Sequence, residues 1–114
     1  SFYRRAVNIV RIESKKDKVD YFSHANMETY NNNQATSLYS ALESLETQLN
    51  TVLKSHNFEK ALQCLEVLKV PVNNFLDNVV VNDSDEKIRI SNLCLLARVG
   101  KIIGKVADFS KIEG

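Results

Sequence analysis

The chain of 114 residues has little glycine and proline, with three Gly, one Pro and no Trp. Because Gly and Pro most often break helices and form turns, their scarcity favours helices over a turn-rich β architecture. Apolar residues make up 44% of the chain and charged residues 25%, which is ordinary for a globular protein. The length fits one domain with a substantial core. We therefore expect a single all-α domain over residues 1–114.

Cysteine is also scarce, and Cys64 and Cys94 each lie inside an apolar helical pattern. Reduced, buried thiols are the favoured interpretation, and a disulfide is the alternative. Together with His24 and His56 these cysteines show no metal-ligand spacing, so no metal site is predicted. No Gly-rich phosphate loop is present, and no Cys or Ser sits beside an oriented base. The sequence thus predicts no catalytic residue and no cofactor in this chain.

Long hydrophobic runs are absent too, and none approaches the roughly 20 residues of a membrane span. No secretory leader is recognisable. We therefore predict a cytoplasmic protein that does not contact a membrane. Since the chain begins with Ser1 rather than Met, we expect it to be a fragment of a longer one.

Charge is distributed unevenly, although the net charge is only +1. Residues 1–18 hold six Lys/Arg against two Asp/Glu, and residues 87–114 hold the same numbers. Residues 19–86 hold three Lys/Arg against ten Asp/Glu. If the two terminal segments lie side by side, their positive charge gathers on one surface and attracts a polyanion. Mutual neutralisation against the acidic middle is the alternative.

Hydrophobic periodicity predicts a bundle of five to six helices. The expected elements are a helix at 2–12, a polar loop at 13–34 with one short helical turn at 19–27, and helices at 35–55, 58–68, 72–79 and 83–106. Asn57 is the expected N-cap of the third helix. Pro71 disfavours helical geometry at the residue before it, so the fourth helix should bend away from the third. Asp83 and Glu86 have the spacing of a capping box that opens the last helix.

The predicted core is apolar and comes from four of these helices. It consists of Leu42, Leu45, Leu49, Leu62, Leu65, Phe75, Leu93, Leu96 and Ile103. In the last helix, Gly100 and Gly104 each cost about 1 kcal/mol relative to Ala. Their spacing of four residues would allow another helix to approach closely. Ordinary tolerance by a well-packed helix is the favoured explanation.

Cationic and amide side chains of the terminal segments are the candidates for binding RNA. Arg4, Asn8 and Arg11 recur at steps of four and three and so share one helix face. Guanidinium groups contact phosphates and stack on unpaired bases, and an Asn amide both donates to and accepts from a base edge. For any single Arg the alternative is a surface ion pair worth at most about 1 kcal/mol. The candidates are Arg4, Arg5, Asn8, Arg11, Lys87, Arg89, Asn92, Arg98 and Lys101.

In the last third, Pro71 opens an apolar run at residues 75–82, an acidic turn follows at residues 83–86, and a long basic-apolar segment comes last. That order resembles the C-terminal anticodon-binding domain of the bacterial glycyl-tRNA synthetase β subunit. That family reads P-x-x-x-F-F-D-x-V-M-V-N, then an acidic turn, then R-x-N-R-L-x-L-L, and closes near A-D-x-S. The matching positions are Pro71, Phe75, Leu76, Asp77, Val79, Val80, Val81, Asn82, Arg89, Leu93, Leu95, Leu96, Ala107, Asp108 and Ser110. Residues 3–9 resemble the family's opening Arg-x-x-Asn-Ile motif, and residues 57–62 its Asp-Tyr-x-x-Ala-Leu segment.

The resemblance implies the α-helical anticodon-binding fold shared with arginyl-tRNA synthetase. It implies a parent glycine–tRNA ligase of two subunits, whose α subunit activates glycine with ATP while the β subunit supplies most tRNA contacts. This domain would be non-catalytic, would have the α subunit as partner of its parent chain, and would bind the anticodon stem-loop of glycine tRNA rather than DNA. The motif match assigns tRNA contacts to Arg5, Asn8 and Arg89.

Two positions depart from the family pattern, since Ser91 replaces Asn and Asn92 replaces Arg. If the lost arginine contacts RNA, Lys87 or Arg98 must compensate; if it makes a structural ion pair, its loss is harmless. The Asp-Ala-Leu-Arg tetrapeptide that names the wider fold group is also absent. The alternative function is a helical protein-interaction or oligomerisation module without RNA binding, motivated by the acidic middle segment.

Overall fold

The computed structural model describes residues 2–24 and 28–113, which form five α-helices and one 3-10 helix and contain no strand. The elements are α1 (Phe2–Asp17), α2 (Asn33–Lys54), α3 (Phe58–Leu65), η1 (Glu66–Leu68), α4 (Lys69–Asn78) and α5 (Glu86–Glu113). The all-α fold class predicted from the sequence is confirmed. The expected helical turn at 19–27 falls partly on residues 25–27, which lie outside the described residues.

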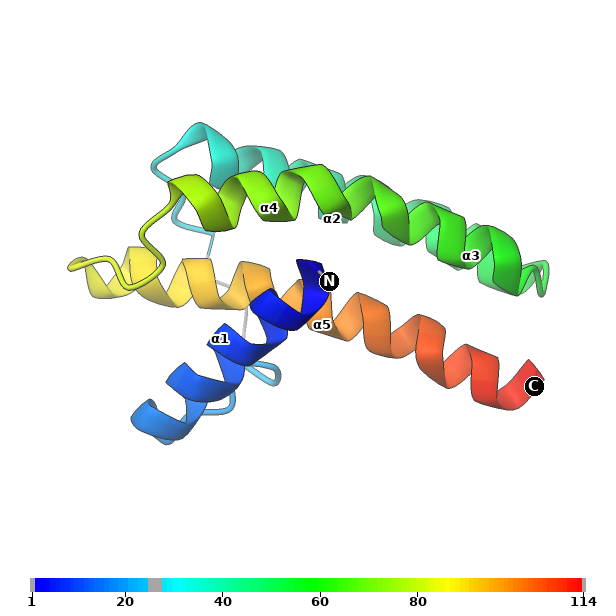
Figure 1. The fold of residues 1–114 in the computed structure, drawn as a ribbon, viewed down its shortest axis with the longest axis horizontal. Helices are drawn as coiled ribbons and strands as arrows, with labels where there is room; N and C mark the ends of the chain where they lie inside the picture. Colours follow the sequence, from blue (N-terminus) through cyan, green and yellow to red (C-terminus); the bar gives the residue numbers. More distant parts are fainter. Residues whose placement is uncertain (1, 25–27, 114) are drawn as a thin grey trace.

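The helices are arranged around α5, the longest of them (Figure 1). On one side, α2 runs antiparallel to the succession of α3, η1 and α4, and both pack against α5 or its neighbours. On the other side, α1 crosses the middle of α5 obliquely, and its first turns reach α4. The first and last helices are therefore direct neighbours. None of the helices within the described ranges is long and apolar enough to cross a membrane.

Asparagine and aspartate side chains mark where three helices begin. Asn32 accepts a hydrogen bond from the Ala35 amide at 2.7 Å, and Asn57 accepts one from the Lys60 amide at 3.0 Å. The predicted N-cap at Asn57 is confirmed. The predicted capping box at Asp83 is wrong, because Asp85 caps α5 by accepting from the Lys87 amide at 2.9 Å. Asp83 instead accepts from the Asp85 amide at 2.8 Å and closes the preceding turn.

The proline does not redirect the chain. Pro71 lies in the first turn of α4, where its missing N–H costs least. In a regular helix its ring would clash with the carbonyl of the residue four positions earlier, which is Val67. Val67 lies in η1, a tighter turn that accommodates the ring. Since α3 and α4 run on in nearly one line in Figure 1, the predicted bend is wrong.

Two helices are longer than the apolar pattern indicates. α1 continues from Ile12 to Asp17, and α5 continues past Val106 to Glu113. The extension of α1 carries Glu13 and Asp17 toward Arg89 of α5, so polar contacts continue the inward face where apolar residues stop.

Most of the predicted core is buried, and the exceptions lie at one end of the bundle. Six of the nine predicted residues are fully buried, namely Leu42, Leu45, Leu49, Phe75, Leu93 and Leu96. Leu62 is 45% exposed, and Leu65 and Ile103 are only partly buried, because they line a groove between α3 and α5. Ile102 is buried in place of Ile103. Cys94 is buried, Cys64 is partly buried, and the two form no disulfide with each other.

The two glycines of α5 have different surroundings. A Cβ added at Gly100 would lie 3.0 Å from Phe22 Cε1 and 3.2 Å from Val7 Cγ2. A Cβ added at Gly104 would meet nothing within 4 Å. Close approach of Phe22 and Val7 therefore explains the glycine at position 100, and the favoured explanation of ordinary tolerance is wrong there. At Gly104, ordinary tolerance of glycine by a well-packed helix is the explanation.

We expect Gly100→Ala to be less stable than Gly104→Ala. Alanine gains about 1 kcal/mol over glycine in a helix interior, but the new methyl at residue 100 crowds Phe22 and Val7. Such overpacking costs about 1–3 kcal/mol. Urea unfolding followed by circular dichroism measures the difference, and equal midpoints for the two variants would show that nothing packs tightly on Gly100.

Candidate nucleic-acid interface

One face of α1 presents three polar side chains to solvent. Arg4, Asn8 and Arg11 are all exposed, and their spacing of four and three residues places them in one row. We call this row the α1 face. Within residues 2–24 and 28–113, neither arginine takes part in an ion pair. Their contact with RNA stays a prediction, and the exposure of both side chains is compatible with it.

The α1 face borders a groove of about 370 Å³ where α1 crosses α5. Besides the α1 face, its lining includes two aromatic residues, Tyr3 and Phe22. From α5 it includes both glycines, so the backbone of that helix forms part of the groove surface. We call this the crossing groove. It combines cations, an amide and aromatic rings, which are the groups that proteins use to bind unpaired nucleotides.

Arg89 holds the two terminal helices together from inside. Its Nη2 donates to Asp17 Oδ2 at 2.6 Å and to Glu13 Oε1 at 3.0 Å, and both carboxylates belong to α1. Its Nε donates to Asn82 Oδ1 at 3.1 Å. The Arg89 side chain is 14% exposed and that of Glu13 is 7% exposed. Arg89 is thus an internal bridge, and its predicted RNA contact does not fit this position.

The same cluster shifts the ionisation of its members. The Tyr21 hydroxyl donates to Asp17 at 2.7 Å, and this bond, together with that from Arg89, lowers the pKa of Asp17. Burial and the hydrogen bond to Asp17 raise the pKa of Tyr21. Burial alone would lower the pKa of Arg89, but the bonds to Asp17 and Glu13 outweigh it, and the pKa is raised. All three groups keep their ordinary charge states at neutral pH.

Two further candidates have internal partners. Arg98 is 9% exposed; it forms an ion pair with Glu46 at 3.2 Å, and its guanidinium lies 5.6 Å from the Tyr39 ring centroid. Asn92 is buried and donates to the Val81 carbonyl at 3.2 Å, which ties α5 to the segment before it. The structure gives both residues packing roles rather than an RNA contact, because the folded chain already encloses them.

The departures from the family motif also face inward. Ser91 is buried, and its Oγ accepts from the Thr29 amide at 3.1 Å. Because Ser91 and Asn92 are both enclosed, both departures fall at positions of internal packing in this chain. Arg98, one of the two residues proposed to compensate, is buried, whereas Lys87 is exposed.

The remaining candidates are exposed but dispersed. Arg5 forms an ion pair with Asp77 at 3.4 Å, and both side chains are more than half exposed, so this pair is weak. Lys87 lies in the first turn of α5. Lys101 lines a separate hollow between α5 and α2, beside Glu46. The structure brings Arg4, Asn8 and Arg11 together. It leaves Arg5, Lys87 and Lys101 apart from them, and the RNA contacts of all six residues stay predictions.

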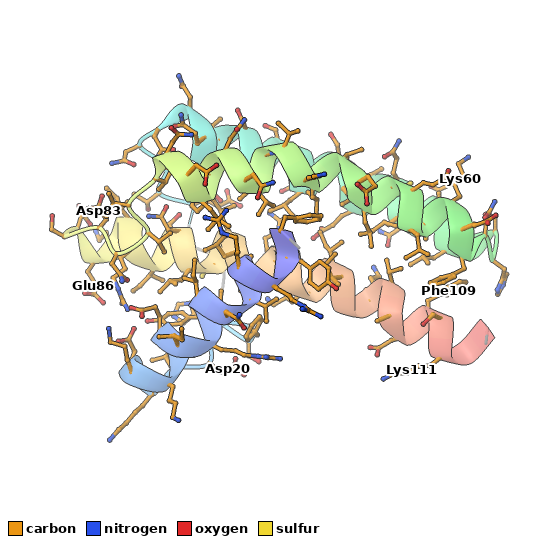
Figure 2. The ribbon with its side chains drawn as sticks, in the orientation of Figure 1. Asp20, Lys60, Asp83, Glu86, Phe109 and Lys111 are labelled. Atoms are coloured by element: carbon orange, nitrogen blue, oxygen red, sulfur yellow. The ribbon has the colours of Figure 1, made fainter. Side chains whose placement is uncertain are left out.

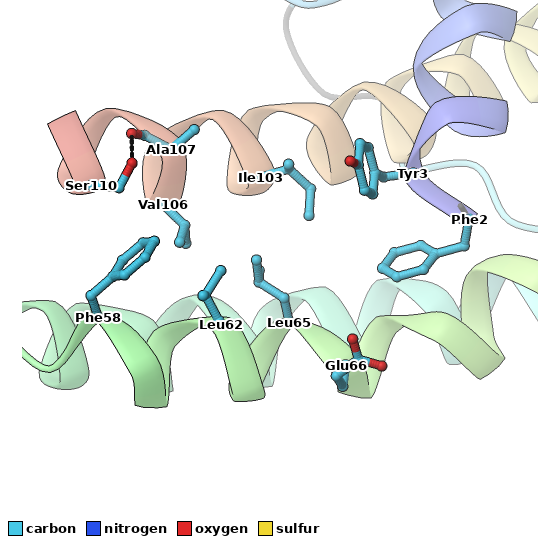
Figure 3. A pocket seen from close by; sticks show the side chains of 10 residues that line it. All are labelled: Phe2, Tyr3, Phe58, Leu62, Leu65, Glu66, Ile103, Val106, Ala107 and Ser110. Atoms are coloured by element: carbon cyan, nitrogen blue, oxygen red, sulfur yellow. Dashed lines mark hydrogen bonds between the residues drawn. The ribbon is translucent and has the colours of Figure 1, made fainter. Parts of the chain in front are cut away.

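A second, larger groove of about 500 Å³ lies between α3 and α5 (Figure 3). Phe58, Leu62 and Leu65 point from α3 toward Val106 of α5. This lining is apolar, and the Glu66 carboxylate beside it would repel phosphate. The groove is therefore poorly suited to RNA. Among the described residues no group of three His, Cys, Asp or Glu could hold a metal ion.

Sequence reasoning missed two contributors to the interface. Phe22 lies in a polar stretch and belongs to no periodic pattern, yet it packs on Gly100 and lines the crossing groove. The sequence predicts a loop that includes Glu13, yet Glu13 is buried and forms an ion pair with Arg89. The available signal for Glu13 was its position three residues after Val10, which places it on the inward face of α1.

Comparison with known proteins gives one family. The sequence matches the DALR anticodon binding domain family over residues 2–113. The glycine–tRNA ligase β subunit of Rhodospirillum centenum is 42% identical over 114 residues, which cover 98% of this chain and 16% of that protein. The β subunits of a Ruegeria species and of Phenylobacterium zucineum are 32% and 38% identical over 112 residues, again covering 98% of this chain.

The chain therefore spans about one sixth of the length of these relatives. No solved structure matches it. The resemblance drawn from the motifs is confirmed, although the Asp-Ala-Leu-Arg tetrapeptide is absent.

We expect Arg89→Ala to destabilise the domain by about 3–5 kcal/mol, because it leaves the buried Glu13 carboxylate only its longer ion pair with the exposed Lys16 at 3.6 Å. The matched control is Arg5→Ala, which removes an exposed pair worth at most about 1 kcal/mol. Urea unfolding measures both. A small loss for Arg89→Ala, equal to that of the control, would show that Arg89 is not the internal bridge.

We expect the stability lost in Asp17→Asn to depend on pH. Because folding lowers the pKa of Asp17 from its ordinary value of 3.8, the ionised carboxylate stabilises the fold fully above that value. This contribution is lost as the pH falls through the folded-state pKa. Urea unfolding of both proteins at neutral pH and at about pH 3 should show a gap that narrows in acid. A constant gap would contradict the role given to Asp17.

Proposed function

Because this chain belongs to the DALR anticodon-binding domain family, we propose that it binds the anticodon stem-loop of a tRNA through the α1 face and the crossing groove. The observation that carries this proposal is the row of Arg4, Asn8 and Arg11 beside a groove with two aromatic rings. Exposed guanidinium groups that pair with no carboxylate of the described residues can neutralise phosphates, and RNA loops present unpaired bases for stacking.

The distribution of charge supports the same side of the molecule. Acidic residues Glu43, Glu46, Glu59, Glu66 and Asp77 belong to α2, α3, η1 and α4. A polyanion is repelled from that layer and attracted to the side of α1, because residues 1–18 hold six of the fifteen Lys/Arg residues. Pooling of charge from both terminal segments is only partial, because Arg89 and Arg98 are neutralised internally.

The relatives give the proposal its wider setting. Since they are named glycine–tRNA ligase β subunits, we propose that the parent of this chain takes part in charging glycine tRNA in the cytoplasm. The ATP-dependent step and the contact with an α subunit belong to other parts of that enzyme. This domain supplies no catalytic residue and acts by holding the tRNA.

We expect a glycine tRNA anticodon stem-loop to bind with an affinity that falls as salt rises, because phosphate contacts release counterions. Arg4→Ala and Arg11→Ala should each weaken binding and reduce the magnitude of the salt slope by about one. Fluorescence anisotropy over a series of salt concentrations measures both quantities.

The matched control is Lys60→Ala, which removes one positive charge from α3. Figure 2 shows Lys60 on the opposite side of α5 from Asp20 in the turn after α1. The Lys60→Ala substitution should leave the affinity for the stem-loop and the salt slope unchanged. Equal binding of a scrambled anticodon would limit recognition to backbone charge. No binding at low salt would remove the proposal and leave the alternative of a protein-interaction module.

A further inference from the structure

We propose that the crossing groove holds one unpaired nucleobase of the bound loop, with its ring among Tyr3, Phe22 and the glycine backbone of α5. This inference rests on the proposed function and adds a subsite to it. The α1 face would then serve the flanking phosphates and the base edge, while the groove serves the base itself.

The shape of the groove suits a flat ring. Its volume of about 370 Å³ lies within the range of roughly 300–1,000 Å³ typical of small-molecule pockets. Gly100 and Gly104 carry no side chain, and a Cβ at Gly104 would meet nothing within 4 Å. The α5 backbone is therefore open at Gly104, where a planar group can approach it closely, whereas Phe22 and Val7 already cover Gly100.

The aromatic lining supplies the attraction. Phe22 is held in place by its contact with Gly100, and Tyr3 is partly buried at the start of α1. Each is fixed by packing on one side and lines the groove on the other. Loss of base stacking on such a ring typically weakens binding by roughly 5- to 150-fold.

The polar lining fits a nucleotide rather than another flat molecule. Arg4 and Arg11 lie roughly 10 Å apart along the axis of α1, with Asn8 between them. Two cations placed on either side of an amide can contact the phosphates before and after one nucleotide while the amide meets its base edge. The groove between α3 and α5 has no cation in its lining, so it lacks this arrangement.

Gly104→Leu tests the subsite directly. Since Gly104 lines the groove and a Cβ there would meet nothing within 4 Å, a leucine enters the groove without a clash at its Cβ, and it has no aromatic face of its own for a base. Gly104→Ala is the matched control, because it makes the same backbone change and leaves the groove largely open. The experiment uses the intact parent protein and a glycine tRNA anticodon stem-loop, so that contacts to the rest of the tRNA do not contribute.

We expect Gly104→Leu to bind the stem-loop roughly 5- to 150-fold more weakly than Gly104→Ala. Its salt slope should equal that of the wild type, because the phosphate contacts remain. Phe22→Leu, which keeps an apolar contact on Gly100, should weaken binding in the same range. This second variant keeps the test valid if Gly104→Leu folds poorly.

Stem-loops with a single abasic nucleotide identify the base. Removing the base at one loop position should weaken binding of the stem-loop to the wild type. The same removal should weaken binding to Gly104→Leu little further, since both changes remove the same contact. The subsite would be overturned if Gly104→Leu and Gly104→Ala bound the stem-loop equally well. It would also be overturned if every base removal weakened binding to Gly104→Leu as much as it weakens binding to the wild type. Stem-loop binding that still depends on Arg4 would then leave the proposed function standing, whereas no binding by the wild type would overturn both.

Discussion

The bridge that Arg89 makes to Glu13 and Asp17 is the interaction on which the rest of the arrangement depends. It joins the first helix to the last, and its groups are largely buried. A buried carboxylate with its cation removed is costly, so the pair specifies how α1 lies on α5. Gly100 acts with it, since the absence of a side chain there lets Val7 and Phe22 approach the α5 backbone. Electrostatics and close packing together set the position of α1.

That position creates the surface for which we propose RNA binding. With Glu13 and Asp17 turned inward to Arg89, α1 has Arg4, Asn8 and Arg11 left on its outer face. The acidic layer of α2, α3 and α4 lies on the other side of α5, where it also neutralises Arg98. The excess of positive charge on α1 and the excess of negative charge on α2 to α4 are therefore partly separated, although the exposed pair of Arg5 with Asp77 joins them. A polyanion meets more attraction on the side of α1, which favours one docking orientation.

Local periodicity was enough to predict the helices, most of the leucine core and the shared face of Arg4, Asn8 and Arg11. It was not enough to decide which cations are exposed. Arg89 and its α1 partners are 72 and 76 residues apart in the chain, so no local pattern shows that they meet. Asp83 has Glu86 three residues on and fits a capping box, whereas Asp85 has Ile88 there, yet the folded turn makes Asp85 the cap. Leu62 fits the apolar pattern of a core residue, but it lies at the edge of a groove.

The most direct test of the account is to map which backbone amides of the isotope-labelled protein shift when an anticodon stem-loop is added. The account predicts that shifts gather on the exposed side of α1, in the turn around Phe22 and near Gly100 and Gly104, while the amides of α3 stay unchanged. Shifts gathered along α3 and the apolar groove, with α1 unaffected, would contradict it.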